Sequence, residues 1–338
     1  MSINTPLNPK SKTPIYLQIA EFFISNIERG ILTPNSIIPS VRDLKKSYSV
    51  SKDTIEKAYS ELKKKGYIYA ASGKGYFVSP INTSDKLRIL CVLNNFSLFK
   101  QKIYYSFVKS LGDLACVDFQ VHNYNPNTLK AILESNIWQY NYIVIMPIFE
   151  SGTDPELYLN ILKSIPENKL ILLDKFIPNI NCNKAVYQDF HADIIGALTQ
   201  AKPYLSKYKN KVAFLPRNKH ELSEIIGKGI EQYGKENNQK IVLTYDILKE
   251  SITKNSFYLV LSDEDLVVLL LKARELNLKV GVDIGIISYN ESELKELLDI
   301  TVVSTDFQLM GETAAELIKE NRNEIIKNSF KIIKRGSL

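Results

Sequence analysis

IPSVRDLKKSYSVSKDTIEKAYSELKKKG (38–66), followed by SGKGYFV (72–78), decides the fold of the first quarter of the chain. Pro39 disfavours helix just before it, and Ser40 is placed to cap a helix over VRDLKKSY through its hydroxyl. After the turn YSV (48–50), Ser51 caps a further helix that Gly66 ends. Two short helices joined by a tight turn are typical of a helix-turn-helix.

The flanking sequence completes this small domain. Before it, apolar residues recur at helical spacing between Pro14 and Gly30, which predicts a first helix. After it, two β-like runs surround SGKG, in which Gly73 and Gly75 permit the positive φ of a tight hairpin. Lys74 then lies at the hairpin tip, a wing placed to touch phosphate or the minor groove.

The charge of the chain is concentrated in this domain. Positions 1–80 hold 12 Lys and Arg against 6 Asp and Glu, and the totals of 43 and 37 leave 31 of each sign for the rest. The net charge of +6 therefore lies in the first quarter. A cationic patch on one small domain is what a protein needs to bind a polyanion by counterion release.

In a helix-turn-helix, the first turn of the second helix faces the major groove of DNA. Lys52, Asp53 and Thr54 would then lie nearest the base edges, with Lys57 one turn further on. The Lys63–Lys65 run is better explained as a solvated helix end.

Residues 14–78 closely resemble, without a gap, the DNA-binding domain of GntR-type bacterial transcription regulators. The resemblance implies operator DNA as partner and predicts DNA contacts at Ser40, Arg42, Ser51, Lys52, Thr54, Lys57, Gly73, Lys74 and Gly75. The family usually has Arg where this chain has Lys52, and often a basic residue where Glu56 stands. Lys cannot form the planar fork of Arg on guanine, so the usual operator sequence is not implied.

From Leu87 onward, apolar runs alternate with amphipathic helical patterns. The runs predict strands at 87–93, 142–148, 169–174, 211–216, 240–245, 256–262, 282–288 and 299–305, and the patterns predict helices at 101–112, 128–138, 155–165, 191–207, 219–237, 263–276, 291–298 and 308–320. Continuous apolar strands between helices indicate parallel sheets covered on both faces. Ligands of such sheets gather at the carboxyl ends of the strands.

This order is similar to the periplasmic-binding-protein-like effector domain of LacI/GalR-type repressors over roughly 87–320. The most specific stretch runs from SFYLVLSDED through VGVDIGIISYN to TDFQLMGETAAELI (256–318), and LILLDKFIP and AVYQDFHADIIGAL match the middle of that domain. The resemblance implies a small molecule, most often a sugar, bound between two lobes. It predicts ligand contacts at Asp174, Asp189, Ser262, Asp263, Asn290 and Thr305, with Phe96, Phe149 and His220 as weaker candidates. The family usually has Asp at the place of Asn290 and Arg near that of Glu224.

Composition excludes several other classes of protein. The longest apolar runs fall far short of the ~20 residues that span a bilayer, and MSINTPLNPKSK has no apolar core for a signal peptide. Three scattered cysteines favour a reducing cytoplasm over a disulfide framework, and three histidines show no metal-binding spacing. Because no nucleophile–His–Asp order, phosphate loop or pyridoxal-phosphate lysine is recognisable, we expect neither a cofactor nor an enzyme.

The sequence thus predicts an α+β winged helix-turn-helix domain at 1–79, a linker at 80–86, and an α/β domain of two parallel-sheet lobes at 87–338. The expected function is a homodimeric, ligand-responsive repressor of a carbohydrate-utilisation operon, released by a monosaccharide or sugar phosphate. The alternative is a DNA-binding regulator whose second domain only dimerises or binds a non-sugar ligand.

Overall fold

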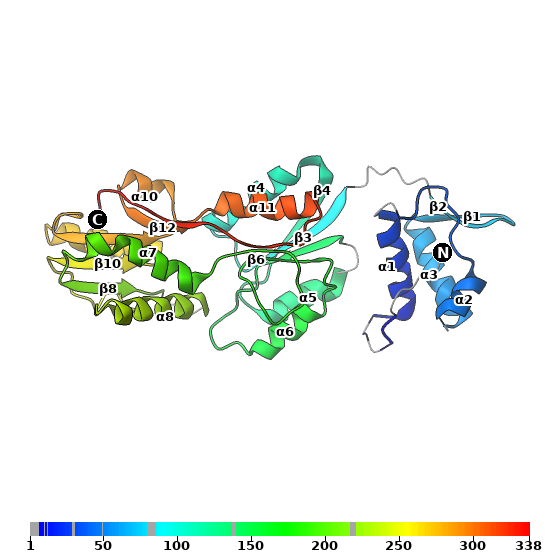
Figure 1. Ribbon diagram of the computed structural model, residues 1–338, viewed down its shortest axis with the longest axis horizontal. Helices are drawn as coiled ribbons and strands as arrows, with labels where there is room; N and C mark the ends of the chain where they lie inside the picture. The colour runs from blue at the N-terminus through cyan, green and yellow to red at the C-terminus, as the bar shows by residue number, and fades with distance from the viewer. Residues whose placement is uncertain are drawn as a thin grey trace. The chain divides into compact units, whose positions relative to one another are not determined.

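The structure is a computed structural model that describes residues 7–9, 11, 13–28, 31–48, 50–79, 86–136, 140–216 and 221–338. It divides into two compact units, Met1–Leu87 and Arg88–Leu338 (Figure 1). The predicted stop at Gly30, the linker residues 80–85, Arg217 and His220 lie outside the described residues. No helix in the described ranges is long and apolar enough to cross a membrane.

The first unit is a winged helix. It contains α1 (Ile15–Glu28), α2 (Val41–Tyr48), α3 (Lys52–Lys64) and the antiparallel pair β1 (Ile68–Ala71) and β2 (Gly75–Val78). Its buried core joins all three helices through Phe23, Leu44, Ile55 and Tyr59, and continues into the hairpin at Ile68 and Val78. These apolar positions recur at helical spacing in the sequence, which made the helices predictable. The three helices predicted for this unit are confirmed.

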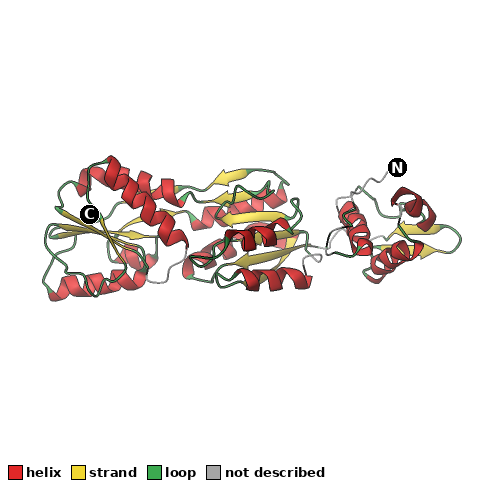
Figure 2. Cartoon of the chain, turned by 90° about the horizontal axis from the view of Figure 1, so that it is seen from below, coloured by secondary structure: helices red, strands yellow, loops and turns green. Residues whose placement is uncertain are grey.

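The second unit consists of two lobes, each with a six-stranded sheet (Figures 1 and 2). In lobe 1 the strand order is β13-β7-β6-β5-β3-β4. Its strands are β3 (Leu87–Leu93), β4 (Ala115–Val121), β5 (Tyr142–Ile145), β6 (Leu170–Asp174), β7 (Ala185–Tyr187) and β13 (Ile325–Lys327), and its helices are α4 (Leu98–Leu111), α5 (Pro126–Asn136), α6 (Pro155–Lys163) and α11 (Phe307–Lys319). A 3-10 turn, η1 (Gly112–Leu114), follows α4.

In lobe 2 the strand order is β14-β12-β11-β10-β8-β9. Its strands are β8 (Asn210–Phe214), β9 (Val242–Thr244), β10 (Ser256–Val260), β11 (Ile284–Tyr289), β12 (Thr301–Thr305) and β14 (Phe330–Ile333), and its helices are α7 (Phe190–Leu205), α8 (Glu221–Glu236), α9 (Asp263–Glu275) and α10 (Glu293–Leu297). All these pairings are parallel except β12 with β14. Cores on both faces bury the sheet, so the prediction of parallel-sheet lobes is confirmed.

The chain passes between the lobes three times. It leaves lobe 1 after β7 to enter α7, returns after β12 to form α11 and β13, and crosses again to form β14. The sheet of each lobe is therefore completed only by residues close to the carboxyl end of the chain.

The close packing of α11 against α4 depends on Gly311. A Cβ at this position would lie 2.1 Å from Ser106 Oγ and 2.3 Å from the carbonyl oxygen of Ile103. Only glycine lets the two helices approach so closely.

The eight predicted strands and eight predicted helices of this unit all form, with ends that shift by a few residues. The strand predicted at 142–148 stops at Ile145, two residues before Pro147, whose ring has no N–H for the ladder. Sequence patterns did not predict β4, β7, β13 and β14. Three of these lie at sheet edges, and β7 and β13 have three residues each, which is too short for a periodic signal.

Candidate functional site

The start of α3 is rigidly capped and exposed. Ser51 Oγ accepts a hydrogen bond from Thr54 N (3.2 Å) and lies 2.8 Å from Thr54 Oγ1, which confirms the predicted cap. Lys52, in the first turn, is exposed and forms a 3.2 Å ion pair with Glu56 one turn on. Glu56, which stands where the family often has a basic residue, thus partly neutralises the charge of Lys52.

The entry to α2 is fixed by reciprocal bonds between Ser40 and Asp43. Ser40 Oγ donates to Asp43 Oδ2 (2.6 Å) and accepts from Asp43 N (3.2 Å). Ser40 N also donates to Asp43 Oδ2 (3.3 Å), and the two hydrogen bonds that Ser40 donates to this carboxylate lower the pKa of Asp43 below its usual range. Tyr59 of α3 donates to the carbonyl oxygen of Pro39 (2.5 Å), which ties this corner to α3 and leaves Arg42 exposed.

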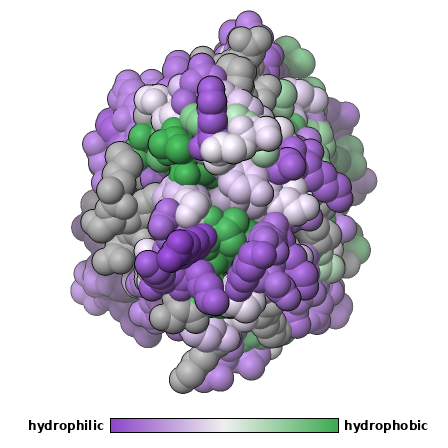
Figure 3. Space-filling view, turned by 90° about the vertical axis from the view of Figure 1, so that its right-hand side faces the viewer, coloured by the Kyte–Doolittle hydropathy of each residue, from purple (hydrophilic) through white to green (hydrophobic). Residues whose placement is uncertain are grey.

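The wing is a four-residue ladder that begins at Ile68–Val78 and ends at Ala71–Gly75. Gly73 and Gly75 have φ of +71° and +105°, values that favour glycine, and Lys74 is exposed between them. Figure 3 shows an end-on view in which hydrophilic side chains predominate and hydrophobic ones form a few small patches. The wing tip therefore exposes the ammonium of Lys74. The glycines on either side have a backbone conformation that other residues rarely adopt.

In the second unit, Asp174 and Asn290 end the strands β6 and β11 with left-handed backbones, at φ of +68° and +65°. Such conformations are uncommon in other residues and cluster at functional sites. Asp174 is 1% exposed, accepts from Gln188 Nε2 (2.5 Å) and pairs with Lys100 of α4. Asn290 Oδ1 is buried without a hydrogen-bond partner in the described part of the chain.

Other buried polar atoms at strand ends also lack a described partner. They include Asn94 Oδ1, after β3, and Gln188 Oε1, after β7. Because a buried polar group without a hydrogen bond costs about 1–3 kcal/mol, such atoms call for a water or a ligand. Asn94 and Gln188 each follow a strand of lobe 1 at its carboxyl end, where ligands of such sheets are expected.

Several predicted ligand residues have side chains that already form hydrogen bonds within the protein. Asp189 and Ser262 cap α7 and α9, and accept from Ala192 N and Asp265 N, both at 3.1 Å. Thr305 is 4% exposed and its hydroxyl bonds Ser329 and Asn328 near the third crossing between the lobes. No observation tests these residues against a ligand, and they remain predictions.

The aromatic candidates differ in their surroundings. Phe149 is fully buried and stacks on Tyr158, with ring centroids 4.8 Å apart. Phe96 is 37% exposed and packs on Phe119 of β4, with centroids 4.6 Å apart. Phe149 is therefore part of the lobe 1 core, whereas Phe96 is partly open to solvent.

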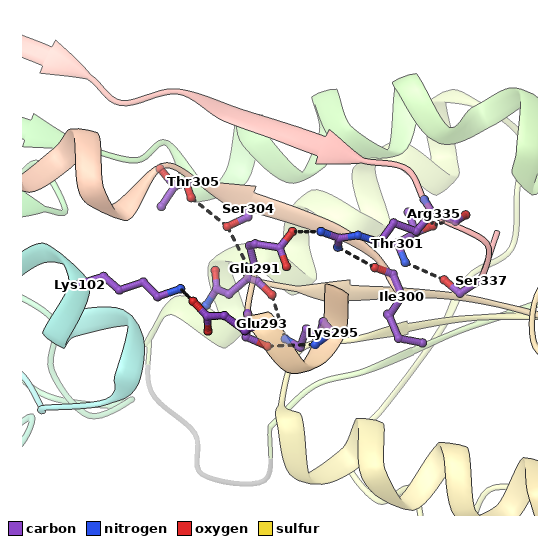
Figure 4. A network of polar contacts seen from close by, with 12 residues as sticks. Lys102, Glu291, Glu293, Lys295, Ile300, Thr301, Ser304, Thr305, Arg335 and Ser337 are labelled. Carbon is purple, nitrogen blue, oxygen red and sulfur yellow. Dashed lines mark hydrogen bonds and ion pairs between the residues drawn. The ribbon is translucent and has the colours of Figure 1, made fainter. Parts of the chain in front are cut away.

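Ion pairs connect the two lobes where their strand ends meet, a region called here the lobe junction. Lys175 pairs with Glu221 (2.5 Å), and Glu221 Oε1 also accepts from Phe149 N (3.0 Å). On α4, Lys102 pairs with Glu293 of α10 (2.8 Å; Figure 4). The first pair is largely buried, at 14% and 21% exposed, whereas the second is open to solvent at 38% and 82%.

Lys295 was missed by sequence reasoning. Its ammonium is 2% exposed, pairs with Asp263 (2.7 Å), and donates to the carbonyl oxygens of Tyr289 (2.6 Å) and Asn290 (2.9 Å). Burial lowers the pKa of Lys295, although Asp263 opposes the shift. The side chain therefore holds two predicted ligand residues in place, and a single lysine between leucines in ELKEL gave no sign of it.

Lys100 was missed as well. A lysine in the first turn of a helix opposes the helix dipole, which is a weak signal that the position is used for something else. In the structure it offsets the buried charge of Asp174.

Comparisons with known proteins agree with this architecture. The family described as "Bacterial regulatory proteins, gntR family" matches residues 15–78. The regulator YhcF of Bacillus subtilis is 30% identical over 105 residues, which cover 31% of this chain and 81% of YhcF. The chain is thus a winged-helix regulatory protein, and it belongs to the gntR family.

Two further relatives differ in how much of their length the match covers. The regulator YurK of Bacillus subtilis is 35% identical over 96 residues, and this chain spans only 38% of its length. The arabinose metabolism transcriptional repressor of Halalkalibacterium halodurans is 23% identical over 338 aligned positions, covering 87% of this chain and 85% of that protein.

Solved structures resemble the fold of the second unit. The Lac repressor bound to ONPG has a TM-score of 0.61 at 16% identity, covering 86% of this chain and 92% of that one. The trehalose repressor from Escherichia coli has a TM-score of 0.58 at 13% identity, covering 74% and 100%. At these identities the likeness establishes the fold, which is that of LacI-type and periplasmic-binding proteins.

Proposed function

We propose that this protein is a ligand-responsive transcription regulator, without enzymatic activity, that acts in the cytoplasm. Residues 1–79 bind operator DNA, residues 80–86 act as linker, and residues 87–338 bind a small sugar and dimerise. The observation that carries the proposal is the exposed, capped start of α3 beside a basic wing, in a chain whose second unit has a two-lobed effector fold.

DNA contact is argued from charge and exposure. Arg42, Lys52, Lys57 and Lys74 are exposed cations on α2, α3 and the wing tip. The first turn of a recognition helix reads bases, whereas a wing-tip cation reaches phosphate. Because Glu56 partly neutralises the charge of Lys52, we propose that recognition of the operator sequence depends mainly on Arg42 and Thr54.

The first test measures binding to DNA from upstream of the protein's own gene by fluorescence anisotropy at several salt concentrations. Lys74→Ala should weaken binding evenly across sequences and reduce the salt slope by about 1, as expected for a phosphate contact. Lys64→Ala, an exposed lysine in the last turn of α3, is the matched control and should change affinity much less. Equal effects of both substitutions would mean that the wing does not touch DNA.

The effector is proposed to be a monosaccharide or sugar phosphate, whose binding releases the DNA and so relieves repression of a carbohydrate-utilisation operon. Unpartnered amide oxygens of Asn94, Gln188 and Asn290 at the strand ends suit the hydroxyl groups of a sugar. The release requires that the sugar bind the conformation with low DNA affinity more tightly than the other.

The second test is a thermal-shift screen against sugars and sugar phosphates. At a hundredfold excess over its dissociation constant, an effector should stabilise the protein by ~2.7 kcal/mol. Asn290→Gly, which keeps the left-handed backbone but removes the amide, should abolish the shift, and Asn277→Gly, at φ of +53° on the surface, should not.

If no sugar raises the melting temperature while DNA binding persists, the alternative holds: the second unit binds a non-sugar ligand or only dimerises. The roles of Asp189 and Ser262 as helix caps, and the pairing of Asp174 with Lys100, give this alternative its support.

A further inference from the structure

One edge of the lobe 2 sheet is lined with lysines. It is the edge where the five parallel strands begin and where β14, which runs the other way, ends. Five of the six strands have an exposed lysine within five residues of this end, and these lysines are called here the basic edge. In the order β14, β11, β10, β8 and β9 they are Lys334, Lys279, Lys254, Lys209 and Lys240.

The loops that carry these lysines are joined by backbone hydrogen bonds. Lys209 N donates to the carbonyl oxygen of Asn255 (2.8 Å), and Asn255 N donates to that of Asp283 (2.8 Å). A Cβ at Gly281 would lie 2.0 Å from the carbonyl oxygen of Gly336, so the loop before β11 also lies against the segment after β14. The lysines are therefore presented by one continuous surface.

The opposite edge of the same sheet has the opposite charge. There, four strands are followed within three residues by an acidic side chain, namely Asp246, Asp263, Glu291 and Asp306. Residues 81–338 are neutral as a whole, so lobe 2 separates charges that balance over the unit. Clustered cations of this kind raise the local concentration of anions.

Most of the basic edge is not neutralised by the chain itself. Three of its lysines form no ion pair with any residue that the structure describes: Lys209, Lys240 and Lys279. Lys254 pairs with Asp283 (3.3 Å) but is still 66% exposed. Because Lys254 and Lys334 do not follow a helix, the attraction of a cation to the carboxyl end of a helix does not account for them.

The length of the row indicates the kind of anion that fits it. Neighbouring strands lie ~4.8 Å apart, so the outermost lysines of a six-stranded sheet are on the order of 24 Å from each other. A small anion is much shorter than this row. A DNA duplex advances about 3.4 Å per base pair, so about 7 base pairs could lie along the row.

We propose that the basic edge is a second DNA-contacting surface, which binds the phosphate backbone of a duplex without reading its sequence. Lysine is a compact cation that lacks the planar fork with which arginine reads guanine, and it suits phosphate. The exposed amides of Asn210 and Asn255 lie beside the lysines and can donate to phosphate oxygens. The inference depends neither on operator binding by the winged helix nor on a sugar.

Other macromolecules fit this surface less well. Interfaces between proteins have an apolar core, and a protein that lies on a membrane buries apolar side chains in it. Near the lysines, Leu276 and Val282 are 54% and 73% exposed. Two apolar side chains beside five lysines do not form such a core, whereas DNA requires none.

The test uses the full chain and a duplex of random sequence that is longer than the row, with binding measured by fluorescence anisotropy at several salt concentrations. A background variant removes the cations that we propose for the winged helix, through Arg42→Ala, Lys52→Ala and Lys74→Ala. Comparison of this background with the wild type tests the winged helix alone. Any effect of the basic edge is then measured within the background, so the two proposals can fail separately.

Within that background, three lysines on neighbouring strands are replaced together: Lys209→Gln, Lys254→Gln and Lys279→Gln. Binding at low salt should weaken by at least about tenfold and the salt slope should fall by about 3, because each phosphate contact contributes ~0.9 to the slope. The melting temperature should not change, since all three side chains are exposed. Arginine at the same three positions keeps the charge and should keep the binding.

The matched control removes three exposed lysines from α5, α6 and α8, through Lys130→Gln, Lys163→Gln and Lys228→Gln. This control has the same net charge as the glutamine variant and should bind the duplex as the background does. Equal binding by the glutamine variant and the control would overturn the proposal. So would binding of the background to vesicles of anionic phospholipid but not to the duplex, because the basic edge would then contact a membrane.

Discussion

At the scale of single residues, His122 makes the stability of lobe 1 sensitive to pH. Its ring is fully buried after β4, Nε2 lies 2.9 Å from the carbonyl oxygen of Met146, and Nδ1 has no partner among the described residues. Burial lowers the pKa of His122 below 6.5, although the bond to Met146 opposes the shift. Below pH 6.5 the unfolded chain therefore binds a proton that the folded chain does not.

It follows that the stability contributed by neutral His122 is present above pH 6.5 and is lost as the pH falls towards the folded-state pKa. Each unit of lowering corresponds to about 1.4 kcal/mol of unfolding free energy. Urea denaturation at about pH 7.5 and about pH 5.5 should show a larger loss for the wild type than for His122→Gln. His191→Gln, on the half-buried start of α7, serves as control. An unchanged pH dependence in His122→Gln would contradict the assignment.

At the scale of elements, the contact of α4 with α11 should be the least tolerant of added volume. Gly311→Ala forces a Cβ against backbone atoms of α4, and the helices must separate, at a cost of roughly 1–3 kcal/mol or more. Gly196→Ala on α7 is the matched change, because nothing lies within 4 Å of the added Cβ. That substitution should be neutral or stabilise by up to about 1 kcal/mol through helix propensity. Chemical denaturation of both variants distinguishes the two cases.

Sequence patterns predicted the elements well where apolar residues repeat over several turns or strands. These patterns failed where the burial of a side chain depends on contacts with another element of the fold. In α10, the pattern of two leucines and one lysine predicts buried leucines and an exposed lysine, whereas Lys295 is buried and Leu297 is 80% exposed. Likewise, the polar strand ends could be found from the sequence, but the pairing of Asp174 with Lys100 could not. That ion pair joins residues 74 positions apart, and only the folded sheet brings them together.

At the scale of the whole molecule, the two compact units should fold independently. Each has a buried core of its own, centred on Phe23 and Tyr59 in the first unit and on the sheets of the two lobes in the second. A fragment of residues 86–338 should therefore unfold with the same transition as in the full chain, as measured by differential scanning calorimetry. If the isolated fragment melted at a distinctly lower temperature, the units would be coupled.

The three passages between the lobes set an order for folding during synthesis. The winged helix is complete once residue 79 has emerged from the ribosome, and domains generally fold as units in this direction. Lobe 1, in contrast, waits for α11 and β13, and lobe 2 for β14, so the two sheets are complete only after Lys327 and Ile333 have been made. The nascent chain therefore has a folded winged helix long before it has either lobe. If the proposed function holds, premature termination would release a fragment that binds DNA but cannot respond to an effector.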